Sequence, residues 1–418
     1  MLAMLAFTAC SSNNDEAVNT PQFWHVTLTA SMGDETTRAL SEGEGNIITA
    51  RFAAADVVKV LKSDGSEVGT LTAKTAGAST TLEGNISGTF SVNEELICRY
   101  RSATANYDNQ VGTLDGIAAN QDYAEGTLTV SATDPLEFTS NSVTLRAKQS
   151  ITKFSFTDGT NPVSVKTFGI AAAGLVRSIA ADATSTETVG AVTGTLATAS
   201  SDVYVALRNN TDAKQTYTFI VKDDAGNWHV GTKNAKLTNG NNYTATVALN
   251  STLTSGSAEG TIGMIGGLPA IVVDLGGTIG KKAVALMNAG ATWPEDYGTY
   301  YTFENRASGL IGSWYVPSKA EFDALAGISS TWGTLNGVSG RLFTIATGKT
   351  LFLPAAGYYD NNNSNGLSLV TSDGYYWSST LTDNSNLAFY LDIDNTGTTP
   401  LSEYIVNALT VRPFHDLP

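Results

Sequence analysis

Short stretches in which every second residue is apolar recur along this 418-residue chain, and no other feature restricts its fold as strongly. Tyr217, Phe219 and Val221 share one face of an extended segment, and residues 243–249 repeat the pattern. A period of two residues is typical of a half-buried β-strand, because successive side chains of a strand point to opposite faces. The chain is therefore expected to be mainly β.

Turn residues separate the predicted strands. Residues 57–62 run into Ser-Asp-Gly-Ser at 63–66, and residues 219–222 run into Asp-Asp-Ala-Gly-Asn at 223–227. Asp, Asn and Gly tolerate the positive φ angles of tight turns, so both places predict hairpins. Strands and turns repeated in this way, with no helical pattern between them, predict β-sandwich domains.

Charge and composition restrict the partners and the chemistry. The chain has 24 Lys and Arg against 39 Asp and Glu, and this net charge of −15 disfavours nucleic-acid binding. The three His residues lie far apart, at positions 25, 229 and 415, so a zinc site is not expected. Cys98 follows two apolar residues in a strand-like setting that predicts a buried, unreactive thiol. We therefore expect a protein that is not an enzyme.

The first ten residues resemble the end of a bacterial lipoprotein signal. An apolar run over residues 1–9 ends at Cys10, and a polar stretch follows. In such a signal the thiol takes a lipid and its residue becomes the new N-terminus. Cys10 is therefore the expected lipidation site, and the precursor is expected to meet the membrane only through this lipid.

Changes in composition divide the chain. We expect a signal at 1–10, a first β-sandwich at 20–150, a second at 151–250, a Ser-, Thr- and Gly-rich linker at 251–260 and a third domain at 261–418. The last third holds ten of the sixteen Tyr and four of the six Trp. It also has the one convincing helix signal, a capping box at 317–321 followed by Phe322, Leu325 and Ala326 on one face. The third domain is therefore expected to be α+β.

Aromatic and polar residues near the C-terminus are the candidate ligand-binding residues. Tyr and Trp offer flat apolar faces with a polar group, which suits carbohydrate, and neighbouring Asp and Asn offer oxygen atoms. The candidates are Tyr358, Tyr359, Asp360, Asn361, Tyr375, Tyr376 and Trp377. The alternative is that alternate members of these pairs fill the core, and for Trp377 we favour this alternative.

Three carboxylates match the spacing of a calcium loop. They are Asp392, Asp394 and Glu403, with Gly397 between them. Oxygen ligands at these intervals can surround a hard cation. The flanking residues are typical of strands, so a plain hairpin turn is the favoured interpretation and calcium is the alternative. No other cofactor is expected.

Several motifs of the last third occur in the order found in the Fibrobacter major paralogous domain. They are Met-Asn-Ala-Gly-Ala-Thr-Trp-Pro-Glu-Asp-Tyr-Gly at 287–298, Trp-Tyr-Val-Pro-Ser at 314–318, Leu-Pro-Ala-Ala-Gly-Tyr at 353–358, Tyr-Trp-Ser-Ser at 376–379 and Val-Arg-Pro at 411–413. Residues 265–415 resemble that family, which looks like a branch of the C-type-lectin-like fold. The resemblance implies a binding domain, but the Glu-Pro-Asn and Trp-Asn-Asp sugar motifs of animal C-type lectins are absent.

The chain from Cys10 to about residue 250 resembles the fimbrillin family of Bacteroides-type pili. The lipoprotein start, Thr-Thr-Arg-Ala at 36–39 and two consecutive β-rich domains carry this resemblance. It implies transthyretin-like β-sandwiches and protease processing after Arg38, which leaves Ala39 as the new N-terminus. Arg51 is a second candidate for the cut, and an ordinary solvated loop at Arg38 is the alternative.

In the fimbrillin family, cleavage is thought to free the subunit from its lipid and to remove a first strand, whose place a strand of the next subunit takes. Val26, Leu28 and Ala30 alternate as such a strand should. Because no free donor strand follows the last motif, we expect a tip or accessory subunit of a fimbrium at the cell surface or outer membrane. Its expected partners are other fimbrial subunits and a glycan or a surface protein. Two alternatives stay open, a non-polymerising surface lipoprotein that binds glycan or protein and a glycan-degrading enzyme.

Overall fold

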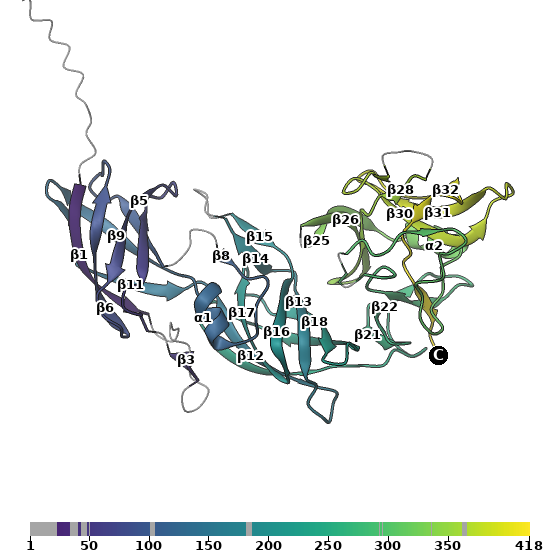
Figure 1. Cartoon of the computed structure of the whole chain (residues 1–418), viewed down its shortest axis with the longest axis horizontal. Helices are drawn as coiled ribbons and strands as arrows, with labels where there is room; N and C mark the ends of the chain where they lie inside the picture. The colour runs from purple at the N-terminus through teal and green to yellow at the C-terminus, as the bar shows by residue number, and fades with distance from the viewer. Residues whose placement is uncertain are drawn as a thin grey trace, which may run out of the picture.

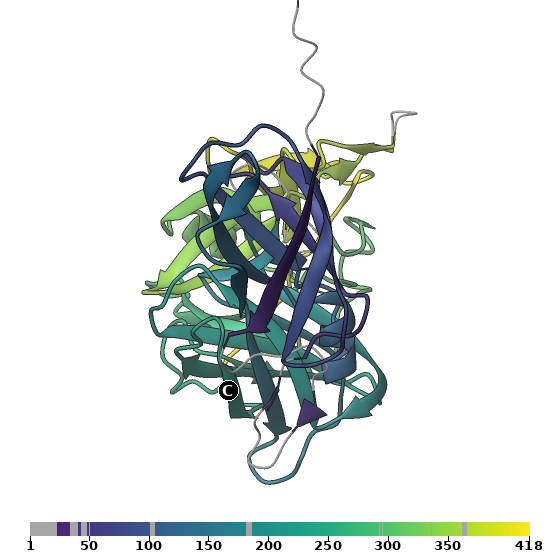
Figure 2. The same cartoon turned by 90° about the vertical axis from the view of Figure 1, so that its left-hand side faces the viewer.

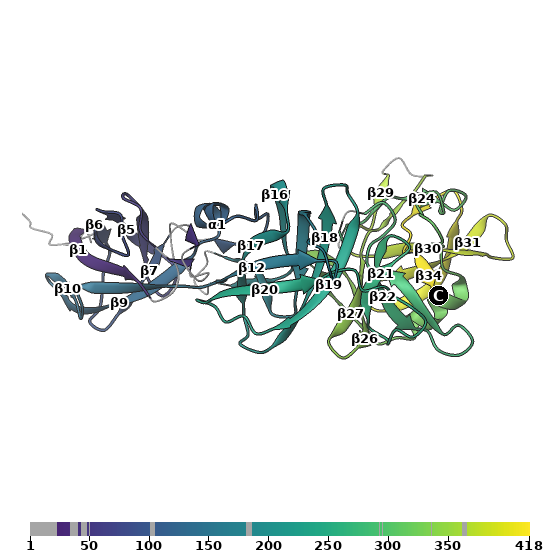
Figure 3. The ribbon, with the colours of Figure 1, turned by 90° about the horizontal axis from the view of Figure 1, so that it is seen from below.

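The computed structural model describes residues 23–33, 41–42, 48–49, 51–100, 105–180, 186–291, 293–294, 296–335, 337–361 and 366–418. These residues form three bodies in a row, with the first strands at one end and the last strands at the other (Figures 1 and 3). Nearly all of the regular structure is β, which confirms the mainly β fold predicted from the alternating pattern.

The N-terminal domain is one sheet that closes on itself. Its strands are β1 (Phe23–Met32), β4 (Val57–Leu61), β5 (Glu67–Ala73), β6 (Ser79–Ser87), β7 (Glu95–Tyr100), β9 (Ala124–Thr133), β10 (Leu136–Phe138) and β11 (Ser142–Ala147). They run in the order β10-β9-β11-β1-β6-β5-β4-β7, and β9 also pairs with β7, so seven strands form a ring. The short strands β2 (Ser41–Glu42) and β3 (Ile48–Thr49) pair with each other. The N-terminal domain is therefore a barrel and not the predicted sandwich, because β9 pairs with β7 along one edge and with β11 along the other.

The middle domain is a sandwich of two sheets. Its strands are β8 (Ala105–Asn106), β12 (Ser150–Thr157), β13 (Val165–Ala171), β14 (Leu175–Ile179), β15 (Glu187–Val189), β16 (Val192–Ser200), β17 (Asp202–Asn209), β18 (Gln215–Asp223), β19 (Trp228–Ala235) and β20 (Asn242–Ala248). One sheet runs β15-β14-β17-β12-β20, with β8 on β14, and the other runs β16-β13-β18-β19. Phe154, Phe156 and Phe219 pack together in the domain's buried core, with ring centroids 4.9 to 6.3 Å apart.

Residues 105–123 belong to the middle domain, although the strands before and after them belong to the barrel. Within this segment lies α1 (Leu114–Asn120), a helix that the sequence did not predict. Gln110 anchors the segment, because its amide donates to Ala206 O and accepts from Ala206 N, both at 2.8 Å. The chain therefore passes between barrel and sandwich three times, at residues 100–105, 123–124 and 147–150. The predicted first domain of 20–150 is therefore interrupted, because residues 105–123 within it belong to the middle domain.

Both predicted hairpins are present. The turn between β4 and β5 contains Gly65 with φ at +81°, and the turn between β18 and β19 contains Gly226 with φ at +87°. Side chains rarely tolerate this left-handed region, so glycine is the residue that fits each turn.

The C-terminal domain consists of four small sheets and a helix. Its strands are β21 (Ile262–Ile265), β22 (Leu268–Asp274), β23 (Lys281–Ala285), β24 (Tyr301–Thr302), β25 (Ser330–Leu335), β26 (Val338–Ala346), β27 (Lys349–Pro354), β28 (Tyr358–Tyr359), β29 (Leu367–Ser368), β30 (Gly374–Leu381), β31 (Leu387–Ile393), β32 (Thr398–Tyr404), β33 (Ala408–Leu409) and β34 (Phe414–Asp416). The sheets run β21-β22-β23-β34, β24-β33-β28-β29, β25-β26-β27 and β30-β31-β32. The predicted helix is α2 (Lys319–Ala326), in which Ser318 and Glu321 form the capping box and Phe322 and Leu325 are buried.

The middle and C-terminal domains share an apolar joint. Trp228 of β19 meets Trp293 edge to face, with ring centroids 5.7 Å apart. Ile220 and Val230 of the middle domain belong to the same buried cluster as Phe322 of the C-terminal domain. The segment predicted as a linker at 251–260 therefore connects two domains that pack against each other. No helix in the described part of the chain has the length and apolar character needed to cross a membrane.

Candidate functional site

The first strand is paired along most of one edge and, over its last four residues, along the other edge. β1 runs antiparallel to β6, from Phe23 opposite Ser87 to Ser31 opposite Ser79, and parallel to β11, from Thr29 opposite Ser142 to Met32 opposite Leu145. Val26, Leu28 and Ala30 are buried in the barrel core, which confirms the alternation read from the sequence. The strand lies on the barrel wall that faces away from the rest of the molecule (Figures 1 and 2).

β1 occupies a groove between two other strands. The neighbouring strands bury Leu82 and Ile86 from β6 and Val143 and Leu145 from β11. If β1 left, the backbone N–H and C=O groups that now bond to it would lose their partners along both edges. The vacated groove would therefore accept another extended segment with apolar residues at alternate positions.

Three residues of the expected processing scheme, Cys10, Arg38 and Ala39, lie outside the described residues. The second candidate for cleavage, Arg51, is described and exposed. It directly precedes Phe52, which is buried in the barrel core. A cut at either Arg would separate β1 from β4 and all later strands.

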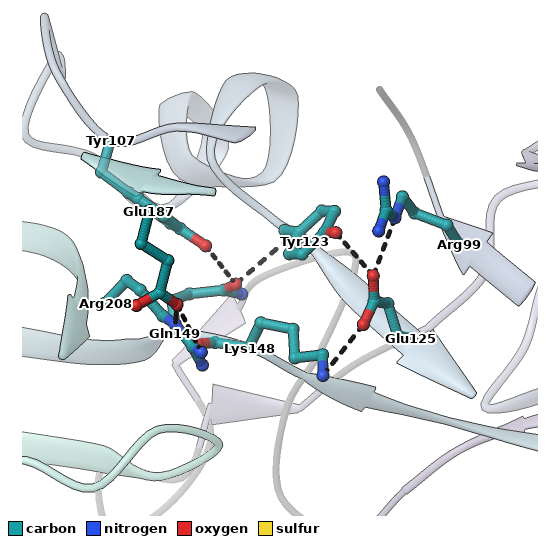
Figure 4. Close-up of polar contacts among 8 residues, drawn as sticks. All are labelled: Arg99, Tyr107, Tyr123, Glu125, Lys148, Gln149, Glu187 and Arg208. Carbon is teal, nitrogen blue, oxygen red and sulfur yellow. Dashed lines mark hydrogen bonds and ion pairs between the residues drawn. The ribbon is translucent and has the colours of Figure 1, made fainter. Parts of the chain in front are cut away.

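A polar network links the barrel to the sandwich (Figure 4). Glu125 of β9 is its centre and accepts from Arg99 Nε at 2.7 Å, from the Tyr123 hydroxyl at 2.6 Å and from Lys148 Nζ at 2.9 Å. Burial acts to raise the pKa of Glu125, but the hydrogen bonds from Tyr123 and Lys148 and the charges of Lys148 and Arg99 hold it below its ordinary value. Glu125 is therefore a carboxylate held in its charged form.

The same network continues into the middle domain. Gln149 Oε1 accepts from Tyr123 N at 3.2 Å and from the Tyr107 hydroxyl at 3.4 Å, and Arg208 pairs with Glu187 at 2.7 Å. Because these groups come from both domains, their hydrogen bonds fix how the barrel sits on the sandwich. Sequence reasoning missed the network, since its members are distant in sequence and none of them belongs to a motif.

The predicted ligand-binding residues include two that fill the core. Tyr376 and Trp377 are fully buried. The Tyr376 hydroxyl donates to Pro354 O at 2.5 Å, and Trp377 Nε1 donates to Tyr301 O at 2.7 Å. Tyr376 and Trp377 are therefore core residues and not part of a ligand-binding surface. For Trp377 this is the alternative that the sequence favoured.

A ladder of tyrosines crosses this part of the domain. The rings of Tyr358 and Tyr375 have centroids 4.8 Å apart, and Tyr375 stacks on Tyr390 at 4.8 Å with an angle of 15° between the planes. Tyr358 is half-buried, while Tyr375 and Tyr390 are nearly buried. Of the three, Tyr358 offers the most accessible ring.

The remaining candidates lie beside the end of β32. Tyr359 is 44% exposed, Asp360 is half-buried and Asn361 is exposed. Asn361 N donates to Asn407 Oδ1 at 3.2 Å, and Asn407 Nδ2 donates to Glu403 Oε1 at 3.2 Å. These contacts bring the end of β28 next to the end of β32.

The three predicted calcium ligands do not converge. Asp394 closes the β31–β32 hairpin and accepts from the N–H groups of Thr396 and Gly397, both at 2.7 Å. Glu403 lies at the other end of β32. Over the described ranges, no group of three or more His, Cys, Asp or Glu is placed to hold a metal ion. Asp394 therefore forms the plain hairpin turn that the sequence favoured, and calcium binding stays a prediction.

Asp392 has unusual surroundings. It lies opposite Tyr375 in the β30–β31 pairing. Burial, together with the charges of Asp373 and Asp394, raises its pKa to about 6. Its Oδ1 atom is buried and has no hydrogen-bond partner among the residues that the structure describes.

The thiol at Cys98 matches its prediction. It is fully buried in the barrel, and burial raises its pKa to about 12. A thiol in this state is protonated at neutral pH and is a poor nucleophile.

Comparison with known proteins gives distant matches. A family described as a domain of unknown function (DUF8237) matches residues 344–414. No curated protein matches the chain. Similar crystal structures include a "putative cell adhesion protein" from Bacteroides uniformis, at 15% identity over 54% of this chain and 96% of that chain with a TM-score of 0.33. A second protein with the same description, from Bacteroides ovatus, has 13% identity over 55% and 96% with a TM-score of 0.32. A fimbrial assembly protein from Parabacteroides distasonis has 13% identity over 60% and 96% with a TM-score of 0.28.

Proposed function

We propose that this protein is an adhesion subunit of a surface fibre, in which β1 of the barrel is exchanged for a strand of a neighbouring subunit. The observation that carries the proposal is the place of β1. It precedes the expected cut at Arg38, it is paired with β6 along most of its length and with β11 over residues 29–32, and it fills the core with Val26, Leu28 and Ala30. A strand of this kind can be replaced by another without changing the rest of the barrel.

Exchange would preserve the interactions that hold the barrel together. A donor strand with apolar residues at alternate positions would restore the hydrogen bonds to β6 and β11 and refill the core. Without a donor, the opened groove would expose Leu82 and Val143 to water. The processed barrel would therefore depend on its neighbour for stability, since a partner that binds the folded state stabilises it.

We assign the adhesive contact to the C-terminal domain. This domain lies at the opposite end of the molecule from β1 (Figures 1 and 3). Its outer strands would stay accessible when the barrel is joined to a neighbour. The protein would then act at the cell surface as a tip or accessory subunit, and a lipid on Cys10 would hold its precursor at the membrane.

Strand exchange can be tested on the purified chain after cleavage by a trypsin-like protease. A biotinylated peptide that reproduces residues 23–32 should enter the cleaved protein and not the intact one. A matched control peptide, with serine in place of Val26, Leu28 and Ala30, should stay out. Equal uptake by cleaved and intact protein, or no uptake by the cleaved protein, would count against the proposal.

The mature N-terminus of protein taken from the native cell surface distinguishes the proposed fibre subunit from a non-polymerising surface lipoprotein. Mass spectrometry should find a chain that begins at Ala39. If all of the chain still carries a lipid on Cys10, the non-polymerising surface lipoprotein becomes the better description.

A further inference from the structure

A cavity of about 240 Å³ lies at the joint between the middle and C-terminal domains. Trp228 of β19 forms part of its wall, and the other described lining residues belong to the C-terminal domain. β19 lies next to β21 and β22 of that domain (Figure 3). Most of the wall is apolar and includes Leu268, Met287, Leu310 and Ile311. Ile311 is 48% exposed, so the cavity reaches the surface of the molecule.

The volume of the cavity suits a small ring system. An apolar protein cavity of about 150 Å³ admits benzene, and the cavity beside Trp228 is larger. An ordered water molecule needs about two to four polar partners, which a mostly apolar wall does not supply. The cavity is therefore better suited to a ring larger than benzene than to a cluster of ordered water.

The wall carries no charge that could pair with an ionised ligand. None of the described residues that line the cavity is ionisable. Lys222 Nζ lies 4.0 Å from the centroid of the Trp228 ring, but Lys222 is not among the lining residues. A charged ligand would lose its water here and gain no opposite charge in return. The wall therefore favours an uncharged ligand.

Two side chains of the wall favour an aromatic ligand. The Trp228 ring is held in place by Trp293, which meets it edge to face at 5.7 Å, and by the Lys222 ammonium. A ring fixed in this way is a preformed surface, so another aromatic ring can pack on it with little loss of side-chain freedom. The Met287 side chain brings a sulfur atom, which makes favourable contacts with aromatic rings.

Asn288 brings an unpaired hydrogen-bond acceptor to the same wall. The residue is 3% exposed and lines the cavity. Its Nδ2 donates to Tyr297 O at 2.9 Å, whereas its Oδ1 is buried and has no hydrogen-bond partner among the described residues. A buried acceptor without a partner costs stability. A ligand N–H group that reaches Asn288 Oδ1 would remove this cost.

We infer that the cavity binds an uncharged bicyclic aromatic ring with one N–H donor, as in indole. The ring would pack on Trp228 and Met287, and its N–H group would donate to Asn288 Oδ1. Such a ring can come from a Trp side chain of a partner protein or from a free small molecule. Because the bound ring would contact both domains, it would stabilise the joint between them. This site is additional to the adhesive role proposed above and does not depend on strand exchange.

The test uses the full chain and 5-fluoroindole, whose fluorine NMR signal should shift and broaden when the protein is added. Unlabelled indole should reverse the change. 1-Methylindole has no N–H donor and should compete about fivefold less well, as expected for one lost hydrogen bond. Indole-3-acetate is charged and should compete about tenfold less well or worse. No change in the signal, or equal competition by indole and either of the other two compounds, would overturn the inference.

Two variants change the wall of the cavity and a third is the matched control. Ala291→Phe places a ring at a lining position and should weaken binding about tenfold, and Ile311→Ala removes an apolar contact and should weaken it about threefold. Leu381→Ala is the control, because Leu381 is 47% exposed in β30 and does not line the cavity. Thermal unfolding checks that each variant folds. Unchanged binding in both cavity variants, or an equal loss in the control, would contradict the inference.

A capped Gly-Trp-Gly peptide distinguishes the two sources of the ring. If the peptide competes as well as indole, the site accepts a Trp side chain of a partner protein. If indole competes and the peptide does not, the site accepts only a free small molecule. The result at this joint leaves the test of strand exchange unaffected, because that test concerns the barrel.

Discussion

Arg99 and Glu125 face each other directly across β7 and β9, with Arg99 Nε 2.7 Å from Glu125 Oε1. Their side chains are only 3% and 16% exposed. Glu125→Gln would leave the Arg99 cation buried beside a neutral amide, and such a loss is strongly destabilising. We expect the free energy of unfolding of the barrel to fall by about 2–4 kcal/mol, measured by urea denaturation.

An exposed ion pair of the same domain is the control for that substitution. Lys59 and Glu67 are 2.6 Å apart, but their side chains are 31% and 42% exposed. Water screens this pair, so Glu67→Gln should change the free energy of unfolding by about 0–1 kcal/mol. An equal effect of both substitutions would show that the burial of Glu125 does not matter.

The Cys98 thiol reports whether the barrel is open. In a Cys10→Ser chain it is the one remaining thiol, and its burial and raised pKa of about 12 should make it slow to react with a disulfide reagent at pH 8. Removal of β1 should raise the labelling rate at least tenfold, and the peptide of residues 23–32 should restore protection. An unchanged rate after removal of β1 would show that the groove does not reach the core.

Asp392 should make the stability of the C-terminal domain depend on pH. Its pKa rises from 3.8 to about 6 on folding, so the folded state favours the protonated form. This contribution to stability is complete below about pH 4 and is lost as the pH rises through 6. Asp392→Asn should therefore stabilise the domain at pH 8, by about 1 kcal/mol after allowance for solvent screening, and have little effect at pH 3.5. Thermal unfolding at both pH values measures the difference, and a destabilised variant at pH 8 would contradict the argument.

Gly194 of β16 allows residues 105–123 to approach the sandwich. A Cβ atom at this position would overlap the carbonyl oxygen of Gln110 and the ring of Phe168. Gly194→Ala should destabilise the middle domain by about 1–3 kcal/mol. Gly256→Ala is the control, because the nearest atom to a Cβ there is Thr254 Oγ1 at 3.7 Å. Circular dichroism during heating compares the two variants, and equal melting temperatures would refute the packing argument.

Local patterns in the sequence predicted the elements whose causes are local. The alternation of Val26, Leu28 and Ala30 defines β1, the capping box at Ser318 and Glu321 defines α2, and each hairpin has its turn residues. The signal in these cases lies within about ten residues, so one sequence is enough to read it.

The unpredicted features depend on contacts between distant segments. Gln110 belongs to no motif of the sequence, yet its amide is paired with Ala206, 96 residues away. Closure of the barrel depends on which strand occupies each edge of β9, and strand pairing leaves no trace in the pattern of a single strand. Burial of Tyr376 and Trp377 follows from the neighbours of β30, for the same reason.

The three connections between barrel and sandwich have a mechanical consequence. A neighbouring subunit seated between β6 and β11 would apply tension to β11, which continues through residues 147–150 into β12. β12 lies between β17 and β20 and is bonded to both, so a pull on it would shear two ladders of hydrogen bonds at once. A second connection, at residues 123–124, resists rotation of one domain about the other. A fibre built from such units would therefore transmit force through its sheets and not through a single flexible strand of backbone.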